Sequence, residues 1–589
     1  MDRSRLSTIL LIVGVFFLVY TLVGKGCSKD EGPNTAIVDE RFEVLKLPES
    51  TPLGAPCVIE TNDFIATIGP VGGGLQGFTL KGTKYVEKGA PIDLAHRTTI
   101  DLSGKQISEY APLRAEFRSD PNRDDQVPGD LVQFSVEKPD PGTCVLRHTT
   151  PDLVEIVRTV KATGRQYELA IETKVTNLAA QPKRHAFSEA LFALQFKKDE
   201  GGMFKRPGAN DVFGASCAHD GGKLDRKAKS DLRKWYVQRG TLDYVAISSA
   251  YLGQALIPED AGAHCALVAQ DMGQKDSDTE QSLIRAVLAY EPKELSAVGS
   301  GNNVATYKQL AFLGPKERHI LAAVAGGGHH VDQLVDLGYF SFIAKYLVSY
   351  VVFLRRIIGS WGLAIVALTL TVRMALLPLT LPQIKSSIAM RRLKPELDIL
   401  NKKFEGDQQA KMLATSQLYK KHGVNPLSGC LPALLQMPVW FALYTSLQTA
   451  IELYHEHFLF WTDLAAPDPR YILPLVLGAT MFLQQKVTPM QMDPAQQKVF
   501  TYFMPAMFTV FMLFLPVGLG VYMLTNSVLG IVQTITVERY MKKQTPAEVK
   551  VEVTTTPKRD KDLAVIDTSE KKARPARELV RRPKDEPEA

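Results

Sequence analysis

The stretch LAIVALTLTVRMALLPLT, residues 363–380, combines two properties that conflict inside a membrane. It is apolar enough to lie in lipid, yet it contains Arg373. Arginine keeps its positive charge in proteins, and insertion scales assign an arginine at the centre of a membrane helix a cost of about 2.5–3.5 kcal/mol. A residue that is this costly to insert indicates a functional site, and the rest of the chain has to show how the charge is accommodated.

The chain of 589 residues has a polar part and an apolar part, which its averages of 45% hydrophobic and 22% charged residues conceal. Residues 6–23 and most of 347–540 are strongly apolar, whereas residues 28–330 have the composition of an ordinary soluble protein. This length implies at least two folding units, and the central one is long enough for a large hydrophobic core.

The N-terminus has an apolar run of 18 residues, Leu6 to Val23, preceded by two arginines. A cleaved signal peptide favours a shorter apolar core and a small-residue cleavage site. Here the run ends in Gly-Lys-Gly-Cys, which suits neither that cleavage nor a lipoprotein site. We therefore expect residues 1–27 to form an uncleaved transmembrane anchor, followed by a charged, proline-rich linker at 28–55.

Residues 56–328 have the pattern of an all-β domain. YELAIETKVTN (167–177) alternates apolar and polar residues, which is the period of a half-buried strand. LVQFSVEKP, VEIVRTVKA, SLIRAVLAYEP and HILAAVA are similar runs separated by turn residues. Many short strands at this spacing predict a β-sandwich.

Two further patterns in this region raise the question of a ligand. GGGLQG (72–77) matches GxGxxG, but dinucleotide binding also requires a helix that begins there. The following FTLKGTKYVEKG is typical of a strand and a turn, so a glycine-rich β-turn is the better interpretation. The six cysteines, at 27, 57, 144, 217, 265 and 430, lack zinc spacing, and we interpret them as incidental. We predict no metal site and no cofactor.

After residue 328 the pattern becomes helical. Residues 329–350 predict a short amphipathic helix, either at the membrane interface or as the last packing helix of the β domain. The apolar runs that follow each approach the roughly 20 residues of a membrane span: 351–377, 431–453, 470–487, 501–517 and 519–537. With the anchor they make six spans. Pro516, Gly518 and Gly520 predict a tight turn between the last two.

The distribution of Lys and Arg predicts the orientation of these spans. The segment 378–429 holds nine basic residues and the tail after residue 538 holds fourteen, whereas the loop 454–469 holds none. We therefore expect both termini and the segment 378–429 in the cytoplasm, and the β domain outside.

The segment 378–429 is expected to form a helical hairpin. One apolar stripe recurs at steps of four, three and four residues: Leu393, Leu397, Leu400 and Phe404. A turn at 405–407 then leads into a second helix. The basic surface of such a hairpin is most often simply solvated, but it can also meet lipid headgroups or RNA. Residues 541–589, rich in charge and proline, are expected to be disordered.

Three explanations are open for how the charge of Arg373 is accommodated in an apolar span. Its side chain could reach the cytoplasmic headgroups, because the span is expected to end just before Pro378, which lies only five residues after Arg373. A structural ion pair is disfavoured, since Glu452 and Glu538 stand only at the ends of later spans. A water-accessible cavity open to the cytoplasm is favoured by polar residues in several spans, although each alone is more often a contact between helices. An arginine in such a cavity would attract a carboxylate-bearing polypeptide segment.

Several stretches resemble the YidC family of membrane protein insertases in its Gram-negative form. They are GLAIVALTLTVRMALLPLT, YKKHGVNPLSGCLPALLQMPVWFALYTSL, DPRYILPLVLGATMFLQQKVTP, DPAQQKVFTYFMP and LPVGLGVYMLTNSVLGIVQ, in family order and spacing. The resemblance is dense over about 330–545 and weaker over the anchor and the β domain.

The resemblance implies a polytopic α-helical membrane protein, whose five core helices at 351–540 enclose a hydrophilic groove open to the cytoplasm. It implies a periplasmic β-supersandwich similar to galactose mutarotases. Family members insert and help fold inner-membrane proteins, alone or with the Sec translocon, and receive ribosome-borne chains, so no enzymatic activity is implied. Possible contacts of this chain are therefore nascent membrane proteins, the Sec translocon, the phospholipid bilayer and, through the hairpin and basic tail, the ribosome.

The resemblance and the helical spacing together give the candidate groove residues. Carried over by position, Arg373 is the groove arginine, with polar partners on other helices. Many relatives have an aromatic residue where Met523 stands, and the usual Ser-Asn pair reads Thr525-Asn526-Ser527 here. Thr369 lies one turn before Arg373 on the same face. The predicted set is Arg373, Thr369, Gln436, Gln484, Tyr522 and Asn526.

Two other classes of function remain open from the sequence. An ion-coupled transporter of small solutes normally places titratable carboxylates or histidines in its spans and often has paired repeats, and neither is visible here. A membrane-tethered enzyme acting on glycans would rest on fold analogy alone, because no His/carboxylate constellation stands out at 56–325.

Overall fold

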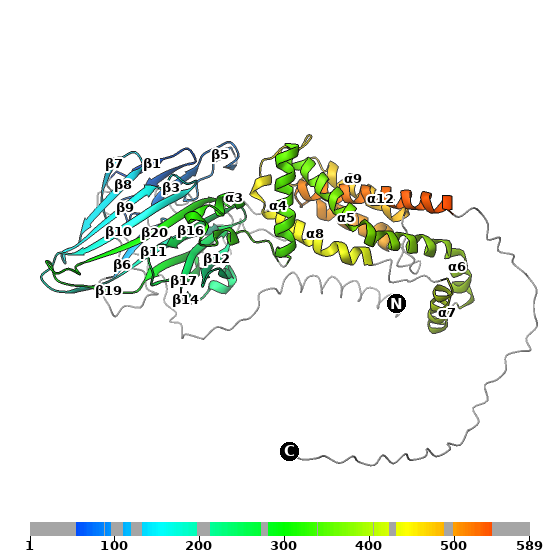
Figure 1. Ribbon diagram of the computed structural model, residues 1–589, viewed down its shortest axis with the longest axis horizontal. Coiled ribbons are helices and arrows are strands. Elements are labelled where there is room, and N and C mark those ends of the chain that lie inside the picture. The colour runs from blue at the N-terminus through cyan, green and yellow to red at the C-terminus, as the bar shows by residue number, and fades with distance from the viewer. Residues whose placement is uncertain are drawn as a thin grey trace, which may run out of the picture. The chain divides into compact units, whose positions relative to one another are not determined.

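The computed structural model describes residues 55–87, 89–95, 110–118, 132–196, 212–272, 281–338, 340–404, 406–422, 431–487 and 499–544. The predicted anchor, almost all of the linker and nearly the whole C-terminal tail lie outside these residues. Strands occupy the first half of the described chain and helices the second half, as the colours from blue to red show in Figure 1. The expected combination of a β-rich domain and a helical region is therefore confirmed.

The strands of the β domain pair antiparallel in four sheets. The largest has nine strands in the order β13 (Lys223–Ala228), β12 (Val212–His219), β15 (Leu242–Ser249), β16 (Leu252–Pro258), β20 (Val304–Pro315), β10 (Glu168–Asn177), β9 (Val154–Ala162), β8 (Thr143–Thr149) and β7 (Ser135–Asp140). A six-stranded sheet contains β14 (Tyr236–Gln238), β17 (Ala263–Met272), β18 (Gln281–Tyr290), β11 (Lys183–Phe196) and β19 (Lys293–Leu295), with β6 (Arg114–Arg118) also paired to β11. The smaller sheets are β1 (Cys57–Glu60), β2 (Phe64–Ile68) and β3 (Leu75–Leu80), and β4 (Val86–Glu87) with β5 (Ala90–Pro91).

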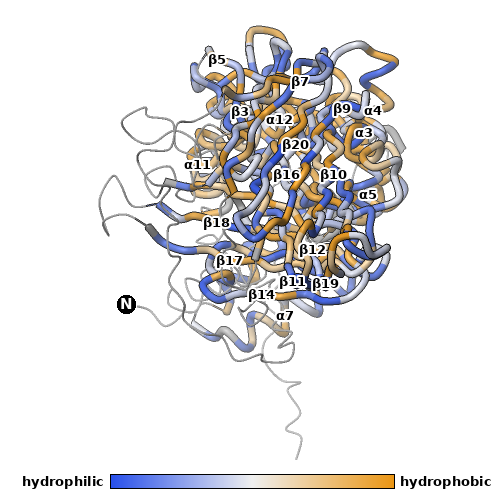
Figure 2. The backbone as a smooth tube through the Cα atoms, turned by 90° about the vertical axis from the view of Figure 1, so that its left-hand side faces the viewer, coloured by the Kyte–Doolittle hydropathy of each residue, from blue (hydrophilic) through white to orange (hydrophobic). Residues whose placement is uncertain are grey.

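Alternating burial explains why these segments form a sandwich. Ile171 and Val175 of β10 are buried, whereas Lys174 between them is exposed, as expected when successive side chains point to opposite faces. Figure 2 shows bands of hydrophobic and hydrophilic residues along strands of the sandwich. The predicted strand HILAAVA (319–325) is wrong. It forms α3 (Arg318–Leu321) and the 3₁₀ turn η3 (Val324–Gly327), because its buried residues 320, 321 and 324 have helical rather than alternating spacing.

The glycine-rich motif at 72–77 is a turn that leads into β3. Gly72 and Gly73 have positive φ angles of 62° and 60°, which favour glycine. A Cβ on Gly73 would lie 3.0 Å from Cδ of Arg158. Arg158 on β9 pairs with Glu189 on β11 through two hydrogen bonds of 2.8 and 2.9 Å, and both side chains are fully buried. The turn therefore makes room for an ion pair between the two large sheets.

Four of the six cysteines form disulfides, Cys57–Cys144 and Cys217–Cys265, so the prediction that the cysteines are incidental is wrong for these four. Cys27 and Cys430 lie outside the described residues. Cys217 lies on β12 and Cys265 on β17, which belong to different sheets. The sequence separations of 87 and 48 residues explain why the pairs are invisible in the sequence. Each crosslink removes freedom from the unfolded chain.

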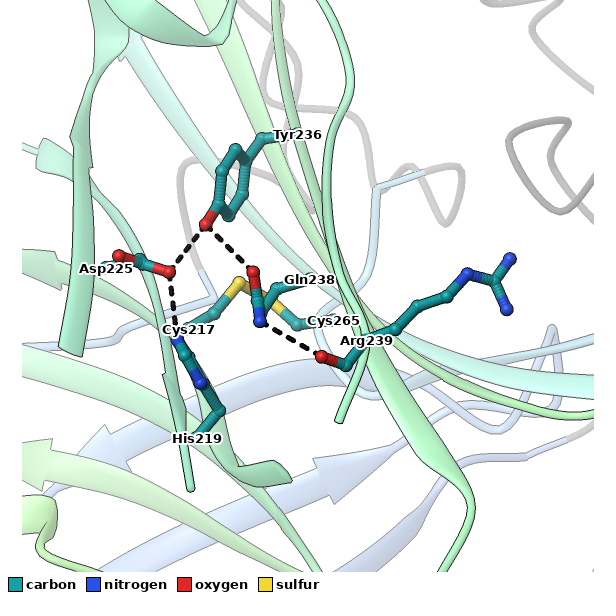
Figure 3. Close-up of a disulfide and its surroundings, with 7 residues drawn as sticks. All are labelled: Cys217, His219, Asp225, Tyr236, Gln238, Arg239 and Cys265. Carbon is teal, nitrogen blue, oxygen red and sulfur yellow. Dashed lines mark hydrogen bonds and ion pairs between the residues drawn. A yellow bond between two sulfur atoms is a disulfide. The ribbon is translucent and has the colours of Figure 1, made fainter. Parts of the chain in front are cut away.

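Polar side chains lie beside the second disulfide, as Figure 3 shows. The Tyr236 hydroxyl on β14 donates to Oδ2 of Asp225 on β13 at 2.6 Å. Nε2 of His219 lies 3.0 Å from the same oxygen. Burial next to this carboxylate raises the pKa of Tyr236, so the phenol stays a donor at neutral pH. The hydrogen bond thus joins the edge strands of the two large sheets.

The helical region contains α4 (Ser341–Ile358), α5 (Trp361–Arg392), α8 (Leu431–Thr449), α9 (Ile472–Val487), α11 (Met504–Met512) and α12 (Val517–Gln544). Single turns precede or join helices at η4 (Val331–Leu334), η6 (Ile451–Leu453) and η7 (Val499–Phe503), whereas η2 (Lys229–Leu232) lies in the β domain between β13 and β14. Two stretches, Trp361–Pro382 and Val517–Met541, are long and apolar enough to cross a membrane, and Ile472–Val487 and Thr501–Met512 are shorter apolar helices. The expected count of six spans is not established by the described residues.

Two expected helix boundaries differ in the structure. The predicted span 351–377 is divided, because Gly359 adopts a left-handed φ of 84° and ends α4, and α5 begins at Trp361. The helix that carries Arg373 continues through Pro378 and Pro382 to Arg392, well beyond the proline at which the sequence predicts its end.

Two short helices after α5 and the turn before α12 complete the helical region. α6 (Lys394–Lys403) and α7 (Gln408–Lys421) follow α5, and the Asp407 side chain caps α7 by accepting hydrogen bonds from the backbone of Gln409 and Ala410. Pro516 lies directly before α12 as expected of a turn, but Gly518 and Gly520 lie within the helix.

Lys316→Met is expected to stabilise the β domain, most strongly near pH 7. Lys316 is buried directly after β20, and burial together with the nearby Arg226 lowers its pKa from 10.5 to about 7. Between these two values the unfolded chain carries a proton that the folded chain lacks, so the stability of the unsubstituted protein rises with pH, by at most about 1.4 kcal/mol per pH unit.

The measurement is the thermal unfolding midpoint of both proteins from pH 7 to 10. The advantage of Lys316→Met should shrink as the pH rises, whereas Lys308→Met, at an exposed position of β20, should give no such trend. An advantage that stays constant with pH would contradict the interpretation.

Candidate functional site between two parallel helices

Arg373 lies in α5 and is hydrogen-bonded to one neighbouring helix. Its Nε donates to Oδ1 of Asn526 at 2.8 Å, and Nη2 donates to the backbone oxygen of Asn526 at 2.7 Å. Nη1 donates to Oε1 of Gln533 at 3.1 Å. Both partners belong to α12. The side chain is half-buried, and its donors are directed at a neighbouring helix rather than only at solvent or lipid headgroups.

A second hydrogen bond continues this contact. Nε2 of Gln533 donates to Oγ1 of Thr380 at 2.9 Å. Thr380 follows Arg373 by seven residues, and Gln533 follows Asn526 by seven, which is about two helical turns and one helix face. Because the residue numbers rise together on α5 and α12, the two helices run parallel. We call Arg373, Thr380, Asn526 and Gln533 the Arg373 cluster.

Gly530 and Gln484 complete the surroundings of the guanidinium. A Cβ built on Gly530 would lie 3.0 Å from Nη2 of Arg373 and 3.1 Å from Nε2 of Gln484. Since such distances are tighter than ordinary van der Waals contacts, the missing side chain at 530 lets the guanidinium approach α12 closely. Gln484 lies on α9, so three helices meet at this point.

The other predicted residues occupy distinct places. Gln436 on α8 donates through Nε2 to the Tyr522 hydroxyl at 2.7 Å. Tyr522 is buried and lies one turn before Asn526, on the same face of α12. Thr369 is also buried, but its hydroxyl donates to the backbone oxygen of Ile365 within its own helix at 2.7 Å. The described hydrogen bonds therefore connect Gln436 with Tyr522 and Asn526 with Arg373, and leave Thr369 outside both pairs.

Gln533 and Thr380 belong to the cluster but are absent from the residues predicted by sequence. Their spacing of seven from Asn526 and Arg373 is a signal that was available. It becomes useful only if α5 continues past Pro378, because Thr380 lies beyond that proline. Proline removes a backbone donor and usually disturbs a helix, and for this reason the sequence favours an earlier end.

Among the described residues, Arg373 has hydrogen-bond acceptors but no nearby counter-ion. The acceptors of Arg373 are an amide side chain, a second amide and a backbone carbonyl, all uncharged. Helices α5, α8, α9, α11 and α12 together contain one carboxylate, Glu538, which pairs with Arg391 at 2.6 Å. In the part of the chain that the structure describes, no carboxylate lies within ion-pair distance of Arg373. Such a guanidinium can still bind a carboxylate, for which its planar fork is suited.

The polar groups of the Arg373 cluster are a guanidinium, two amides and a hydroxyl. Across the described ranges, no group of three or more His, Cys, Asp or Glu residues could hold a metal ion. The chemistry that the cluster offers is therefore hydrogen bonding and attraction of an anion.

Comparison with known families covers nearly all of the described chain. The profile of the YidC periplasmic domain matches residues 57–350, and that of the 60Kd inner membrane protein matches residues 353–544.

Individual proteins are similar over most of their length. A membrane protein insertase YidC of Geotalea daltonii is 31% identical over 569 residues, which cover 92% of this chain and 99% of that protein. The YidC insertase of Anaeromyxobacter dehalogenans strain 2CP-C is 32% identical and covers 80% of this chain and 82% of its own. A solved structure described as active YidC insertase with the first transmembrane domain resolved covers 89% of this chain and 98% of its own, at 16% identity and a TM-score of 0.35.

Asn526→Leu is expected to destabilise the helical region. The substitution keeps a side chain that branches at Cγ but removes the Oδ1 acceptor of Arg373, and a half-buried charged donor that loses its acceptor costs about 1–3 kcal/mol. The measurement is the thermal unfolding midpoint in detergent. Val532→Ala, at an exposed position of α12, is the control and should leave the midpoint nearly unchanged. Equal midpoints for Asn526→Leu and the unsubstituted protein would contradict the importance of this hydrogen bond.

Proposed function

Since this chain belongs to the YidC family of membrane protein insertases, we propose that the Arg373 cluster receives the polar segment of an inserting polypeptide. The protein is an inner-membrane insertase with a periplasmic domain and is not an enzyme. The observation that carries the proposal is a half-buried guanidinium whose hydrogen-bond acceptors are all uncharged. An acidic segment can supply a negative charge for a limited time, because none of the described carboxylates has to be displaced from Arg373 itself.

The proposed groove consists of the cluster and the predicted residues around it. Gln484 lies next to the guanidinium, and the Gln436–Tyr522 pair lies one turn away along α12. Amide and hydroxyl groups can exchange hydrogen bonds with a passing backbone, so this lining reduces the cost of bringing polar groups into the membrane. Thr369 stands one turn from Arg373 and contributes a small side chain to the same region.

The membrane is expected to be thin next to this groove. α9 has 16 residues and α11 has nine, so α9 is about 24 Å long at 1.5 Å per residue, compared with a hydrocarbon core of about 30 Å. Short apolar helices are accommodated by local thinning of the bilayer. A shorter barrier would help the acidic segment to cross without ATP, while the adjoining apolar segment moves sideways into lipid.

We infer that the β domain and the segment between α8 and α9 face the periplasm, and that α6 and α7 face the cytoplasm. Two observations support this. The basic residues are concentrated in the segment 378–429 and the tail. The two disulfides lie in the β domain, and disulfides persist in oxidising compartments such as the periplasm. The parallel course of α5 and α12 is consistent with both helices entering from the periplasmic side.

Further partners follow from exposed surfaces. α4 presents a face of large apolar residues at helical spacing, Phe342, Tyr346, Phe353 and Ile357, between 55% and 74% exposed. With Arg355 and Arg356 in its last turn, this face fits the interface of a phospholipid bilayer. The basic hairpin and tail would contact ribosomes that deliver nascent membrane proteins, and the Sec translocon is a further proposed partner.

Arg373→Ala is expected to reduce insertion of a substrate that has a short acidic periplasmic tail, by roughly tenfold or more if one charge-assisted contact is lost. Arg373→Lys should retain much of the activity if the charge itself is what matters. The measurement is the amount of protease-protected product after insertion into proteoliposomes. A substrate with a neutral tail is the control, and unchanged insertion of the acidic-tail substrate by the alanine variant would contradict the proposal.

The orientation is tested with single cysteines in whole cells. Leu153→Cys in the exposed turn before β9 should react with a membrane-impermeant maleimide once the outer membrane is opened. Ser416→Cys, at an exposed position of α7, should react only after the inner membrane is disrupted. Reaction in the reverse order would show that the inferred orientation is inverted.

A further inference from the structure

The contact between α5 and α12 extends beyond the Arg373 cluster to a second arginine. Arg391, in the last turn of α5, places Nη2 2.6 Å from Oε2 of Glu538 on α12. Its Nη1 donates to the backbone oxygen of Val487 at 2.9 Å. Val487 is the last residue of α9, where carbonyl groups lack partners within the helix. One guanidinium therefore joins the same ends of three helices.

The two arginines lie on one face of α5. Arg391 follows Arg373 by 18 residues, which is five turns of 3.6 residues, so both side chains leave the helix in nearly the same direction. α12 provides partners for both, and the Gln533–Thr380 hydrogen bond lies between them. The result is a line of polar contacts along two parallel helices, from Arg373 to Arg391. We call this line the polar seam.

The charges along the polar seam are distributed unevenly. Glu538 is the one carboxylate in helices α5, α8, α9, α11 and α12, and it pairs with the arginine at the end of the seam rather than with Arg373. The side chains of Arg391 and Glu538 are 30% and 22% exposed. Water can therefore reach the pair, and a released Glu538 carboxylate can be hydrated again. A partly exposed ion pair of this kind is weak enough to open.

We propose that Arg391 is a receiving site for carboxylates of the incoming polypeptide, which exchange with Glu538 before the segment moves along the polar seam to Arg373. This inference rests on the function proposed for Arg373. The exchange replaces one carboxylate on a guanidinium by another, so the number of charge-assisted hydrogen bonds is preserved. The bond from Arg391 to Val487 keeps the guanidinium in place while Glu538 leaves. The paired state also keeps the mouth of the seam electrically neutral, which avoids permanent capture of acidic segments there.

A pair that only fastened helices together would behave differently from an exchange site. An ion pair that only stabilises the packing of the helices needs both partners equally. Its loss would lower the insertion rate of every substrate, whatever its tail. Exchange depends on Arg391 as the receiver, whereas Glu538 is the group that is displaced. The two possibilities therefore predict different results when each partner is neutralised separately.

The test uses the full chain in proteoliposomes and two substrates that differ only in their short tail, with two glutamates or two glutamines. Arg391→Gln is expected to lower the initial insertion rate of the acidic-tail substrate by roughly tenfold, equivalent to about 1.4 kcal/mol, and that of the glutamine-tail substrate by less than about twofold. Glu538→Gln should leave the acidic-tail rate equal or higher. The double variant should behave like Arg391→Gln.

Three controls complete the experiment. Arg392→Gln removes the neighbouring exposed arginine and should leave both rates unchanged. Arg391→Lys keeps the charge and should retain most of the acidic-tail rate, which separates loss of charge from misfolding. Arg373→Ala reports on the proposed function itself.

The outcomes distinguish the two proposals. If Glu538→Gln lowers insertion as strongly as Arg391→Gln, for both tails, the pair only fastens the helices and the exchange is wrong. If Arg373→Ala leaves acidic-tail insertion unchanged, the function proposed for Arg373 is wrong instead.

Discussion

A guanidinium inside an apolar helix requires hydrogen-bond acceptors, and in this chain α12 supplies them. Asn526 provides two acceptors and Gln533 a third, while Gly530 leaves the space that the guanidinium occupies. Together with the Gln533–Thr380 hydrogen bond, these contacts join α5 and α12 along one face of each helix, with the two helices parallel. The acceptors are neutral, so they satisfy the donors of Arg373 without cancelling its charge. A positive charge that is well held but not neutralised is suited to an acidic guest that binds and leaves.

Besides the contact between Arg373 and α12, the β domain, the short apolar helices and α4 have features suited to a membrane protein. The β domain has a large core, a fully buried Arg158–Glu189 pair and two disulfides. Ile451 and Tyr454, which follow α8, pack into the same core. The short apolar helices α9 and α11 favour a thinner membrane near the polar residues. The amphipathic α4 is separated from α5 by Gly359, which allows one helix to follow the interface while the next crosses the bilayer.

The sequence predicted those features that depend on local pattern. Strand alternation predicted β10. The unusual position of Arg373 among apolar residues marked that side chain as a candidate, and the predicted set includes Asn526 but not Thr380 or Gln533. Features that depend on long-range geometry were missed. The disulfide pairs require the order of strands in the sheets, and Thr380 requires a helix that continues through Pro378. The division of the span 351–377 depends on one left-handed glycine, whose φ angle the sequence permits but does not determine.

Contact between the Arg373 cluster and the acidic part of a substrate can be measured by site-specific photocrosslinking. A photoreactive amino acid at Thr380, next to Gln533, would be activated during insertion of a substrate with a short acidic tail. A crosslink to the tail is expected, which weakens when the acidic residues of the tail are replaced by amides and weakens likewise in Arg373→Ala. Equal crosslinking of acidic and amide tails, with or without Arg373, would contradict this contact.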